Sequence, residues 1–303
     1  MRYRVNRALY SLRDRKRGIE TIRSLAELDD VLTEVEGLFS QSHDQAMHRL
    51  NHIRFTGEMP LGLDPYSGQY REIVQEQYQK ISGNKNYSAH QNEKSHFDLE
   101  EAKRRPYPYL TGSAYTVGEQ LVAQGFIVSE MNLPKDARVV EMGPGWGNLT
   151  LHLALTGYET HAVEIDGPST EILKHRARNQ HVDIAVHQCD MIDFQSSEKF
   201  DAVIFYESFH HSFYPFELLQ RARSLLKDNG KLILAGEPIT IFPNPWSLRF
   251  DGLSLWSIRK YGWLELGFDV KFFENMLSRA GYKFRHKKLR GYHPARIITC
   301  EKI

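Results

Sequence analysis

The chain has 303 residues, of which 41% are hydrophobic and 25% are charged, and its formal net charge is +1. This length allows one large domain or two modest ones. A charge so near zero argues against bulk electrostatic binding of nucleic acid, and no apolar run approaches the roughly 18 to 20 residues of a membrane span. The two cysteines, Cys189 and Cys300, are too few for a disulfide framework or a zinc cluster, which favours a cytoplasmic location.

Residues 1–18 are basic and lack the long apolar core of a secretory signal. Two interpretations stay open for this segment, namely a solvated arm and an amphipathic surface contact. Downstream, Ser24-Leu-Ala-Glu27 is a capping box, and apolar residues follow it at helical spacing as far as Phe39. Further helices are expected at 42–54, at 67–81 and near 115–126, and the polar stretch 83–97 predicts a mobile loop.

From residue 137 onward the sequence alternates between short β-branched or apolar runs and helical stretches. This alternation predicts an α/β fold with a doubly wound, mostly parallel sheet of seven strands. The tail predicts two strands, 282–289 and 295–302, joined by a tight turn at Arg290 and Gly291, so that an antiparallel strand lies near the end of the sheet. The other expected strands are 137–142, 159–165, 182–188, 200–206 and 230–236, and the expected helices are 147–156, 168–179 and 214–227, with only a short connection at 190–199.

The segment 139-VVEMGPGWGNLT-150 ends the first of these strands and carries three glycines, each two residues from the next. Glycines in such a turn let a ligand lie against the main chain, and the helix that starts there offers free N–H groups. A dinucleotide site would require glycine at 148, where the chain has Asn148. Glu141 stands two residues before the first glycine and would be a poor neighbour for a pyrophosphate.

The spacing acid-x-G-x-G-x-G resembles motif I of the class I methyltransferases that use S-adenosylmethionine. In that family the turn cradles the methionine part of the cofactor, whose ammonium and sulfonium groups suit a nearby acid. Glu164 follows the first glycine at the spacing of about 20 residues that is typical of an acid binding ribose hydroxyls. The resemblance makes Glu164 the ribose acid and packs Ile165 on the adenine. It also places Asp190 at the adenine amino group and Met191 against the ring.

The resemblance extends over about 115–303, since 228-DNGKLILAGEP-238 is similar to the family's fifth strand, with Asn229 in place of its first glycine. It implies S-adenosylmethionine as the cofactor. The residues of the implied cofactor site are Glu141, Gly143, Pro144, Gly145, Gly147, Asn148, Glu164, Ile165, Asp190, Met191 and Tyr206.

The catalytic candidates Glu207, His210 and His211 follow the fourth strand, a position that lies beside the methyl group in this fold. A hydroxyl acceptor needs its proton removed, and histidine suits this task with an unperturbed pKa of about 6.5. Either histidine is a candidate base, and Glu207 is a candidate to orient it or to bind the acceptor. Packing around the cofactor is the alternative for both histidines. Together with Glu237 these side chains could also form a metal site, although no metal is assigned.

Two segments are candidates for the acceptor site. The first precedes the first strand and could fold over the cofactor as a lid, with contacts from Tyr107, Tyr109, Thr111 and Ser113. The second, 236–266, mixes aromatic and charged side chains that suit a sugar or another polar ring, and that equally suit the core of a helical cap or a dimer contact. Its members are Trp246, Arg249, Asp251, Trp256, Arg259 and Trp263.

A separate group of histidines lies in the predicted helix at 42–54 and consists of His43, His48 and His52. We interpret it as a solvated helix face rather than a metal site.

The sequence therefore predicts a helical extension or lid over 1–110 and a Rossmann-like methyltransferase domain over 111–303, with an acceptor-site insertion at about 236–266. The predicted function is O-methylation of a small-molecule or carbohydrate-like acceptor with a histidine general base. Methylation of nitrogen or carbon and an inactive cofactor-binding scaffold remain alternatives. A nicotinamide oxidoreductase is a third alternative, which Asn148 and Glu141 disfavour. No nucleic acid partner is expected, and a homodimer stays open.

Overall fold

The computed structural model describes residues 2–57, 62–84, 86–107, 109–290 and 295–303. These residues form two compact units. The first, which we call the helical unit, comprises the chain up to Lys94 together with Pro238–Phe273. The second, which we call the sheet unit, comprises Ser95–Glu237 and Glu274–Ile303.

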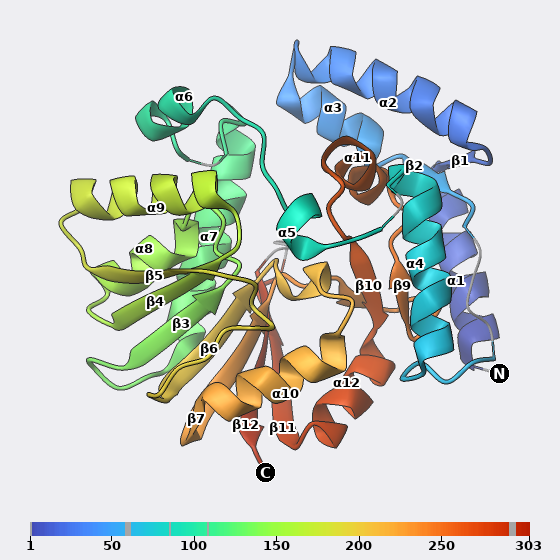
Figure 1. Ribbon diagram of the computed structural model, residues 1–303. Coiled ribbons are helices and arrows are strands. Elements are labelled where there is room, and N and C mark those ends of the chain that lie inside the picture. Colours follow the sequence, from blue (N-terminus) through green and yellow to red (C-terminus); the bar gives the residue numbers. More distant parts are fainter. Residues whose placement is uncertain (1, 58–61, 85, 108, 291–294) are drawn as a thin grey trace. The chain divides into compact units, whose positions relative to one another are not determined.

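The sheet unit contains one sheet of seven strands in the order β11-β12-β7-β6-β3-β4-β5 (Figure 1). The strands pair in parallel, except that β12 runs antiparallel to both β7 and β11. The predicted seven-stranded, mostly parallel sheet with an antiparallel strand near the C-terminus is thereby confirmed. The strands are β3 (Arg138–Met142), β4 (Glu159–Glu164), β5 (Ile184–Gln188), β6 (Phe200–Tyr206), β7 (Leu226–Ala235), β11 (Tyr282–Lys288) and β12 (Arg296–Lys302).

Three helices, α7, α8 and α9, cover one face of this sheet, and α10 lies on the other face over β6 and β7 (Figure 1). Ile127 of α7 and Leu149 of α8 pack against Ile204 of β6 in the larger apolar core. Leu173 of α9 packs against Ala162 of β4 in a second cluster. The helices of this unit are α6 (Leu99–Arg104), α7 (Ala114–Met131), α8 (Asn148–Leu155), α9 (Gly167–Asn179) and α10 (Pro215–Leu225).

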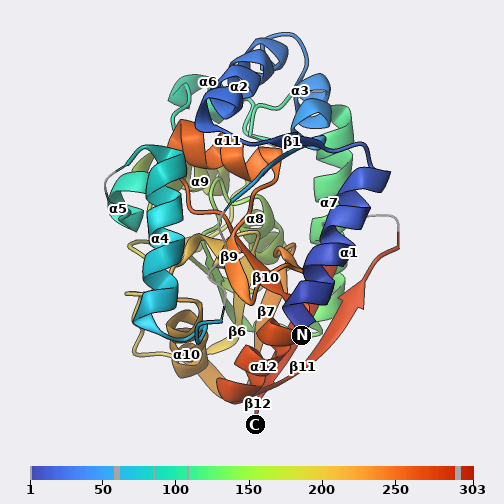
Figure 2. The ribbon, with the colours of Figure 1, turned by 90° about the vertical axis from the view of Figure 1, so that its right-hand side faces the viewer.

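The helical unit combines several helices with two small sheets, one of β1 and β2 and one in the order β8-β10-β9. Figure 2 shows the second sheet between α1 and α4. Tyr70 of α4 donates its hydroxyl hydrogen to the main-chain oxygen of Trp246 in β9, and Asn6 of α1 donates to Asp269 at the end of β10, at 2.9 Å. The elements are α1 (Arg2–Lys16), β1 (Glu20–Ile22), α2 (Leu25–Phe39), α3 (His43–Leu50), β2 (Ile53–Phe55), α4 (Gly68–Ser82), α5 (Ala89–Asn92), β8 (Ile239–Thr240), β9 (Trp246–Leu248), α11 (Gly252–Tyr261) and β10 (Leu266–Asp269), and α12 (Val270–Arg279) leads back to the sheet unit.

Ser24 accepts the N–H of Glu27 at 3.2 Å, so the capping box begins α2 as predicted. The helix predicted at 42–54 is shorter, because α3 ends at Leu50 and the chain then enters β2, which pairs with β1. The loop predicted at 83–97 contains the short helix α5. The predicted turn at Arg290 and Gly291 reaches into 291–294, which lie outside the described residues.

The two compact units differ from the predicted division at residue 110. Residues 95–110 belong to the sheet unit, where Lys103 of α6 forms an ion pair with Glu171 of α9 at 2.7 Å. Most of the 236–266 insertion belongs to the helical unit, because α11 packs on α3 and α4 and Arg259 pairs with Asp29 of α2 at 2.8 Å. Within the described ranges, no helix is both long and apolar enough to cross a bilayer.

Candidate active site

The turn between β3 and α8 forms a bare stretch of main chain. Gly143, Gly145 and Gly147 have φ angles of +68°, +55° and +75°, in the left-handed region that favours glycine. A Cβ atom on Gly143 would lie 2.8 Å from Cβ of Ser208, and one on Gly147 would lie 2.2 Å from Cδ1 of Leu173. Packing as well as backbone conformation therefore requires glycine at both of these positions.

Glu164, at the end of β4, ties that strand to the glycine turn. One of its carboxylate oxygens accepts the N–H of Gly145 at 2.8 Å, and the other accepts the N–H of Asp166 at 2.9 Å. The turn itself is closed by the N–H of Gly147, which donates to the main-chain oxygen of Pro144 at 2.9 Å. Burial raises the pKa of Glu164 to about 7, although the two N–H donors oppose this shift.

Glu141 is the second buried carboxylate of this turn, and only 1% of it is exposed. It accepts the hydroxyl hydrogen of Thr150, one turn into α8, at 2.5 Å. Burial raises the pKa of Glu141 to about 7, and the charge of Glu164 adds to the shift. Among the residues that the structure describes, no ion pair joins Glu141 or Glu164 to a basic side chain, and this arrangement favours a cationic ligand.

Arg176, which no sequence motif singled out, joins α9 to the same turn. Its Nη1 donates to the main-chain oxygen of Trp146 and to the side-chain oxygen of Asn148, both at 2.6 Å. Burial lowers the pKa of Arg176 to about 10. The residue that breaks the dinucleotide pattern, Asn148, is therefore a hydrogen-bond acceptor that holds the start of α8 against α9.

Tyr109 lies over the glycine turn from the segment that precedes α7. Its hydroxyl oxygen would be 3.1 Å from a Cβ atom on Gly145, and its ring centroid lies 5.1 Å from that of Trp146. The φ angle of Tyr109 is +53°, an uncommon value for a residue with a side chain. The predicted lid segment therefore reaches the glycine turn through this tyrosine.

A hydrogen-bonded chain of polar side chains connects α7 to the end of β6. Tyr206 donates its hydroxyl hydrogen to Gln120 at 2.7 Å, and Gln120 donates in turn to Glu207 at 3.4 Å. Burial and the neighbouring Glu207 raise the pKa of Tyr206. Glu207 has a φ angle of +53° and an exposed side chain that runs over Gly236, where a Cβ atom would lie 2.5 Å from its Cγ. Gly236 thus leaves the room that Glu207 occupies.

His210 forms a buried pair with Glu237. Nδ1 of His210 lies 2.8 Å from Oε2 of Glu237, and the side chains are 7% and 1% exposed. Glu237 also accepts the N–H groups of Ser208 and Phe209, each at 2.9 Å. Burial alone would raise the pKa of Glu237, but the imidazole and the N–H donors outweigh it and hold that pKa below its usual range. The neighbouring ring of His211 lies 4.3 Å from that of His210, measured between centroids.

The residues expected around the adenine lie at the carboxyl ends of β4 and β5. Ile165, Asp190 and Met191 directly follow these ends and are half-buried. Asp190 accepts the N–H of Ile192 at 3.1 Å, which holds its carboxylate in the turn after β5. Because the carboxyl ends of parallel strands share one edge of a sheet, these residues lie on the same edge as the glycine turn.

The aromatic insertion is engaged inside the helical unit. Arg249 forms a two-bond ion pair with Asp251, at 2.9 and 3.1 Å, and a further pair with Glu265 at 3.3 Å. The three indole N–H groups also have partners there, since Trp246 donates to Pro65, Trp256 to Glu36 and Trp263 to Lys94. These contacts favour the helical-cap interpretation of the insertion over sugar binding.

The histidines of α3 and the residue that follows it contact one another. The ring centroids of His48 and His52 lie 4.3 Å apart, and Nδ1 of His52 lies 2.7 Å from the main-chain oxygen of His48. His43 packs on Phe39 at 5.6 Å between centroids. Both contacts are local, because they join residues four positions apart in the chain.

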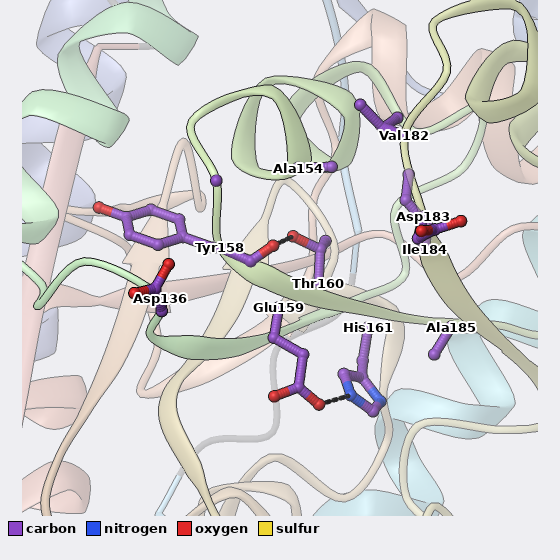
Figure 3. A pocket seen from close by; sticks show the side chains of 11 residues that line it. Asp136, Ala154, Tyr158, Glu159, Thr160, His161, Val182, Asp183, Ile184 and Ala185 are labelled. Carbon is purple, nitrogen blue, oxygen red and sulfur yellow. Dashed lines mark hydrogen bonds and ion pairs between the residues drawn. The ribbon is translucent and has the colours of Figure 1, made fainter.

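An open pocket lies at the opposite edge of the sheet, at the amino ends of β4 and β5 (Figure 3). Figure 3 shows the side chains of Glu159 and His161 pointing toward each other. Oε1 of Glu159 and Nε2 of His161 lie 3.4 Å apart. Doubly wound sheets bind their ligands outside the carboxyl ends of the strands. Because the glycine turn and the His210 pair follow those carboxyl ends, we place the active site there rather than in this pocket.

Three properties of the carboxyl edge fit S-adenosylmethionine. Three of the five residues in the glycine turn, Gly143, Gly145 and Gly147, have no Cβ atom. The buried Glu141 and Glu164 favour a ligand that carries positive charge. In addition, Nδ2 of Asn148 and Oδ1 of Asp166 are buried and have no hydrogen-bond partner among the described residues, so the site has unused polar groups of both kinds.

Residues 140–234 match a protein family described as a methyltransferase domain. No curated protein sequence matches the chain. Among solved structures, the magnesium protoporphyrin IX methyltransferase of Synechocystis PCC 6803, with bound SAH, is 19% identical. The alignment covers 67% of this chain and 94% of that one, with a TM-score of 0.49. A Burkholderia thailandensis 1,6-didemethyltoxoflavin-N1-methyltransferase is 14% identical, with coverage of 68% and 85% and a TM-score of 0.47.

A third solved structure, described as that of a putative O-methyltransferase from Nostoc punctiforme PCC 73102, is 18% identical, with coverage of 68% and 66% and a TM-score of 0.48. The family match covers β3 to β7, which include the glycine turn and Glu164. Residues 140–234 therefore form a methyltransferase domain, and the chain is an enzyme that uses S-adenosylmethionine.

Proposed function

We propose that the chain methylates a hydroxyl oxygen of a small or carbohydrate-like acceptor, with His210 as the general base. The observation that carries this proposal is the buried pair of His210 and Glu237, 2.8 Å apart. A carboxylate at Nδ1 favours the tautomer with its hydrogen on that nitrogen, so that the lone pair on Nε2 is the one that takes a proton. Glu237 then stabilises the imidazolium that forms when the acceptor hydroxyl loses its proton.

The glycine turn and its acids are proposed as the cofactor site. When bound, S-adenosylmethionine supplies an electrophilic methyl group on a sulfonium. Glu164 would accept hydrogen bonds from the ribose, Glu141 would face the positive charge, and the main chain at Gly145 would lie against the aminoacyl part. Ile165, Asp190 and Met191 would hold the adenine. The remaining proposed contacts are Gly143, Pro144, Gly147, Asn148 and Tyr206.

The lid segment is proposed to exclude water from this site. The ring of Tyr109 packs on Trp146 directly beside Gly145, so it would cover a ligand that lies along the turn. Excluding water strengthens the electrostatic interactions of the buried acids and keeps the two reactants in line. Glu207, exposed at the end of β6, is the proposed contact for the acceptor. We place the reaction in the cytoplasm, which is supported by the free thiols of Cys189 and Cys300.

The experiment that tests the function is incubation of the full chain with labelled cofactor and a panel of sugars, nucleotide sugars and phenols, with and without a chelator. Mass spectrometry of the product locates the methyl group. We expect an O-methyl product at a rate that the chelator leaves unchanged. A methyl group on nitrogen or carbon would overturn the choice of oxygen, and cofactor binding without any turnover would point to an inactive scaffold.

A further inference from the structure

Helix α1 contacts the rest of the helical unit through its polar face. Asn6 is 7% exposed and donates to the carboxylate of Asp269 at 2.9 Å. One turn further, the hydroxyl of Tyr10 accepts from Arg54 at 2.9 Å, and Asp14 forms an ion pair with the same arginine at 2.5 Å. A helix on a protein surface ordinarily buries its apolar stripe and exposes its polar face. In α1 the packed face is instead mostly polar, and the ring of Tyr10 against Phe242 is an aromatic contact on it.

The outward face of α1 carries an apolar stripe. Val5, Leu9 and Leu12 are 53%, 48% and 51% exposed. At about 100° per residue, their side chains fall within about 60° of the helix circumference. Single exposed apolar residues are normal on a protein surface, but an aligned set on one helix face forms a continuous strip that a partner can cover.

Basic side chains border this apolar stripe on both sides. Arg13 lies along one edge and Arg4 and Arg15 lie along the other. The single acid of α1, Asp14, lies on the packed face and pairs with Arg54. Among the described residues, no ion pair or side-chain hydrogen bond engages the basic groups of Arg4, Arg13, Arg15, Lys16 and Arg17. The outward face therefore combines aliphatic side chains with positive charge that no acid neutralises.

We propose that α1 is a docking surface for an anionic lipid membrane and lies parallel to that membrane when bound. The aliphatic side chains of Val5, Leu9 and Leu12 would enter the boundary between headgroups and acyl chains. Long basic side chains on both sides would reach the lipid phosphates. The apolar stripe would thus meet the acyl chains, and the basic side chains at its edges would meet the phosphates of the headgroups.

The way α1 is held favours a flat partner over the alternatives. Its face with Asn6, Tyr10 and Asp14 is already packed, so a protein groove could not enclose the helix, whereas a membrane needs only the outward face. An RNA strand would use the arginines and would leave the aliphatic stripe uncovered, because RNA is bound through phosphate contacts and aromatic stacking. A second copy of the chain would cover the stripe but would bring two sets of positive charge together.

The proposal is tested by co-sedimentation of the full chain with vesicles of phosphatidylcholine alone and of phosphatidylcholine with an equal part of phosphatidylserine. We expect binding to the anionic vesicles only, and we expect salt to weaken it. The variant with Leu9→Ser and Leu12→Ser should bind at least about tenfold more weakly. The variant with Arg4→Gln and Arg13→Gln should bind about thirtyfold more weakly.

Matched controls come from α7, α8 and α9. Leu121 and Leu155 are 48% and 54% exposed, so Leu121→Ser with Leu155→Ser repeats the apolar change elsewhere. Lys174→Gln with Arg178→Gln removes two exposed charges from α9. Both controls should bind vesicles like the unmodified chain, and circular dichroism with a thermal melt of every variant shows that each is folded.

Three results would overturn the proposal. One is the absence of binding to anionic vesicles, or binding that the α1 variants leave unchanged. Another is a dimer, seen by light scattering, that the serine variant of α1 dissociates, since a second copy would then cover the stripe. The last is RNA binding that needs Arg4 and Arg13 but not Leu9 and Leu12, without any binding to lipid.

Discussion

Nδ1 of His210 points at Oε2 of Glu237 across 2.8 Å, in a region from which water is nearly excluded. The carboxylate is fixed independently of the ring, because Ser208 and Phe209 donate their main-chain N–H groups to it. The pKa of Glu237 lies below the usual value for a glutamate, so its carboxylate stays ionised. It can therefore orient the ring of His210 and support its protonation without being protonated itself.

The first prediction concerns the base. His210→Asn should keep cofactor affinity but lower turnover by about 10²- to 10⁴-fold. Asparagine can donate to Glu237 as the imidazole does, so the buried carboxylate keeps a partner while the proton acceptor is lost. Calorimetry measures cofactor affinity, and labelled cofactor measures turnover. His211→Asn is the matched control and should remain active. Full activity in His210→Asn, or an equal loss in both variants, would contradict the assignment.

The second prediction concerns the pH dependence of cofactor binding. The pKa values of Glu141 and Glu164 are both about 7, and a cationic cofactor favours their ionised forms. Affinity should therefore rise between about pH 6 and about pH 8, by up to about tenfold per pH unit for each carboxylate. Binding should release protons, which calorimetry in two buffers of different ionisation heat detects. An affinity independent of pH, with no proton release, is the opposing result.

The third prediction concerns the stability of the ligand-free chain. The folded pKa of Glu141 is about 7 and lies above its unfolded value. A raised pKa gives stability that is complete below the unfolded pKa and is lost as the pH rises through the folded pKa. Glu141→Gln removes this loss, so it should raise the melting temperature at about pH 8 by a few degrees and change it little at about pH 4. An equal shift at both pH values would argue against a buried, ionisable group.

The fourth prediction concerns the glycine turn. Gly145→Val should abolish cofactor binding, because φ at this position is +55° and the new side chain would meet the hydroxyl of Tyr109 and the face that the ligand needs. Gly157→Val is the matched control, since Gly157 also has a positive φ, of +97°, but nothing lies within 4 Å of a Cβ atom there. The control variant should lose some stability and keep its cofactor affinity. If calorimetry found wild-type cofactor affinity in Gly145→Val, the proposed role of the glycine turn in cofactor binding would be wrong.

The fifth prediction concerns the helical unit. Arg249→Met leaves Asp251 and Glu265 without their shared counter-charge and should lower the free energy of unfolding by about 2 to 4 kcal/mol. Lys260→Met removes a more exposed pair with Glu36 and should cost about 1 kcal/mol or less. Urea denaturation followed by fluorescence compares the two variants. Similar costs would mean that Arg249 is not a structural centre of this unit.

The local sequence pattern was sufficient to predict the seven-stranded sheet and the glycine turn. Alternating apolar runs and helical stretches predicted the strands and helices of the sheet unit. Strands of a parallel sheet are buried on both faces and therefore appear as short, continuous apolar runs between the helices. The spacing of Gly143, Gly145 and Gly147 after a strand likewise predicted a bare turn. In the helical unit, the same reasoning missed β1 and β2, since strands of three residues carry no detectable period.

The partners of the site residues could not be read from the sequence. Arg176 holds Asn148 across 28 positions, and Glu237 holds His210 across 27. Neither spacing belongs to a motif, because the distance between two strand ends depends on the order of the strands in the sheet. Trp246, Trp256 and Trp263 illustrate the converse: their composition suited a sugar site, but their N–H groups are used within the helical unit.

The sequence by itself determined most strands and helices of the sheet unit, the position of the glycine turn, and which acids stand beside that turn. These properties depend on neighbours a few residues apart. Only the tertiary structure decided that Glu237 faces His210, that 238–273 completes the unit begun by the first 94 residues, and that α1 presents Val5, Leu9 and Leu12 to solvent. Those relationships arise from packing between segments distant in the chain, which local periodicity does not encode.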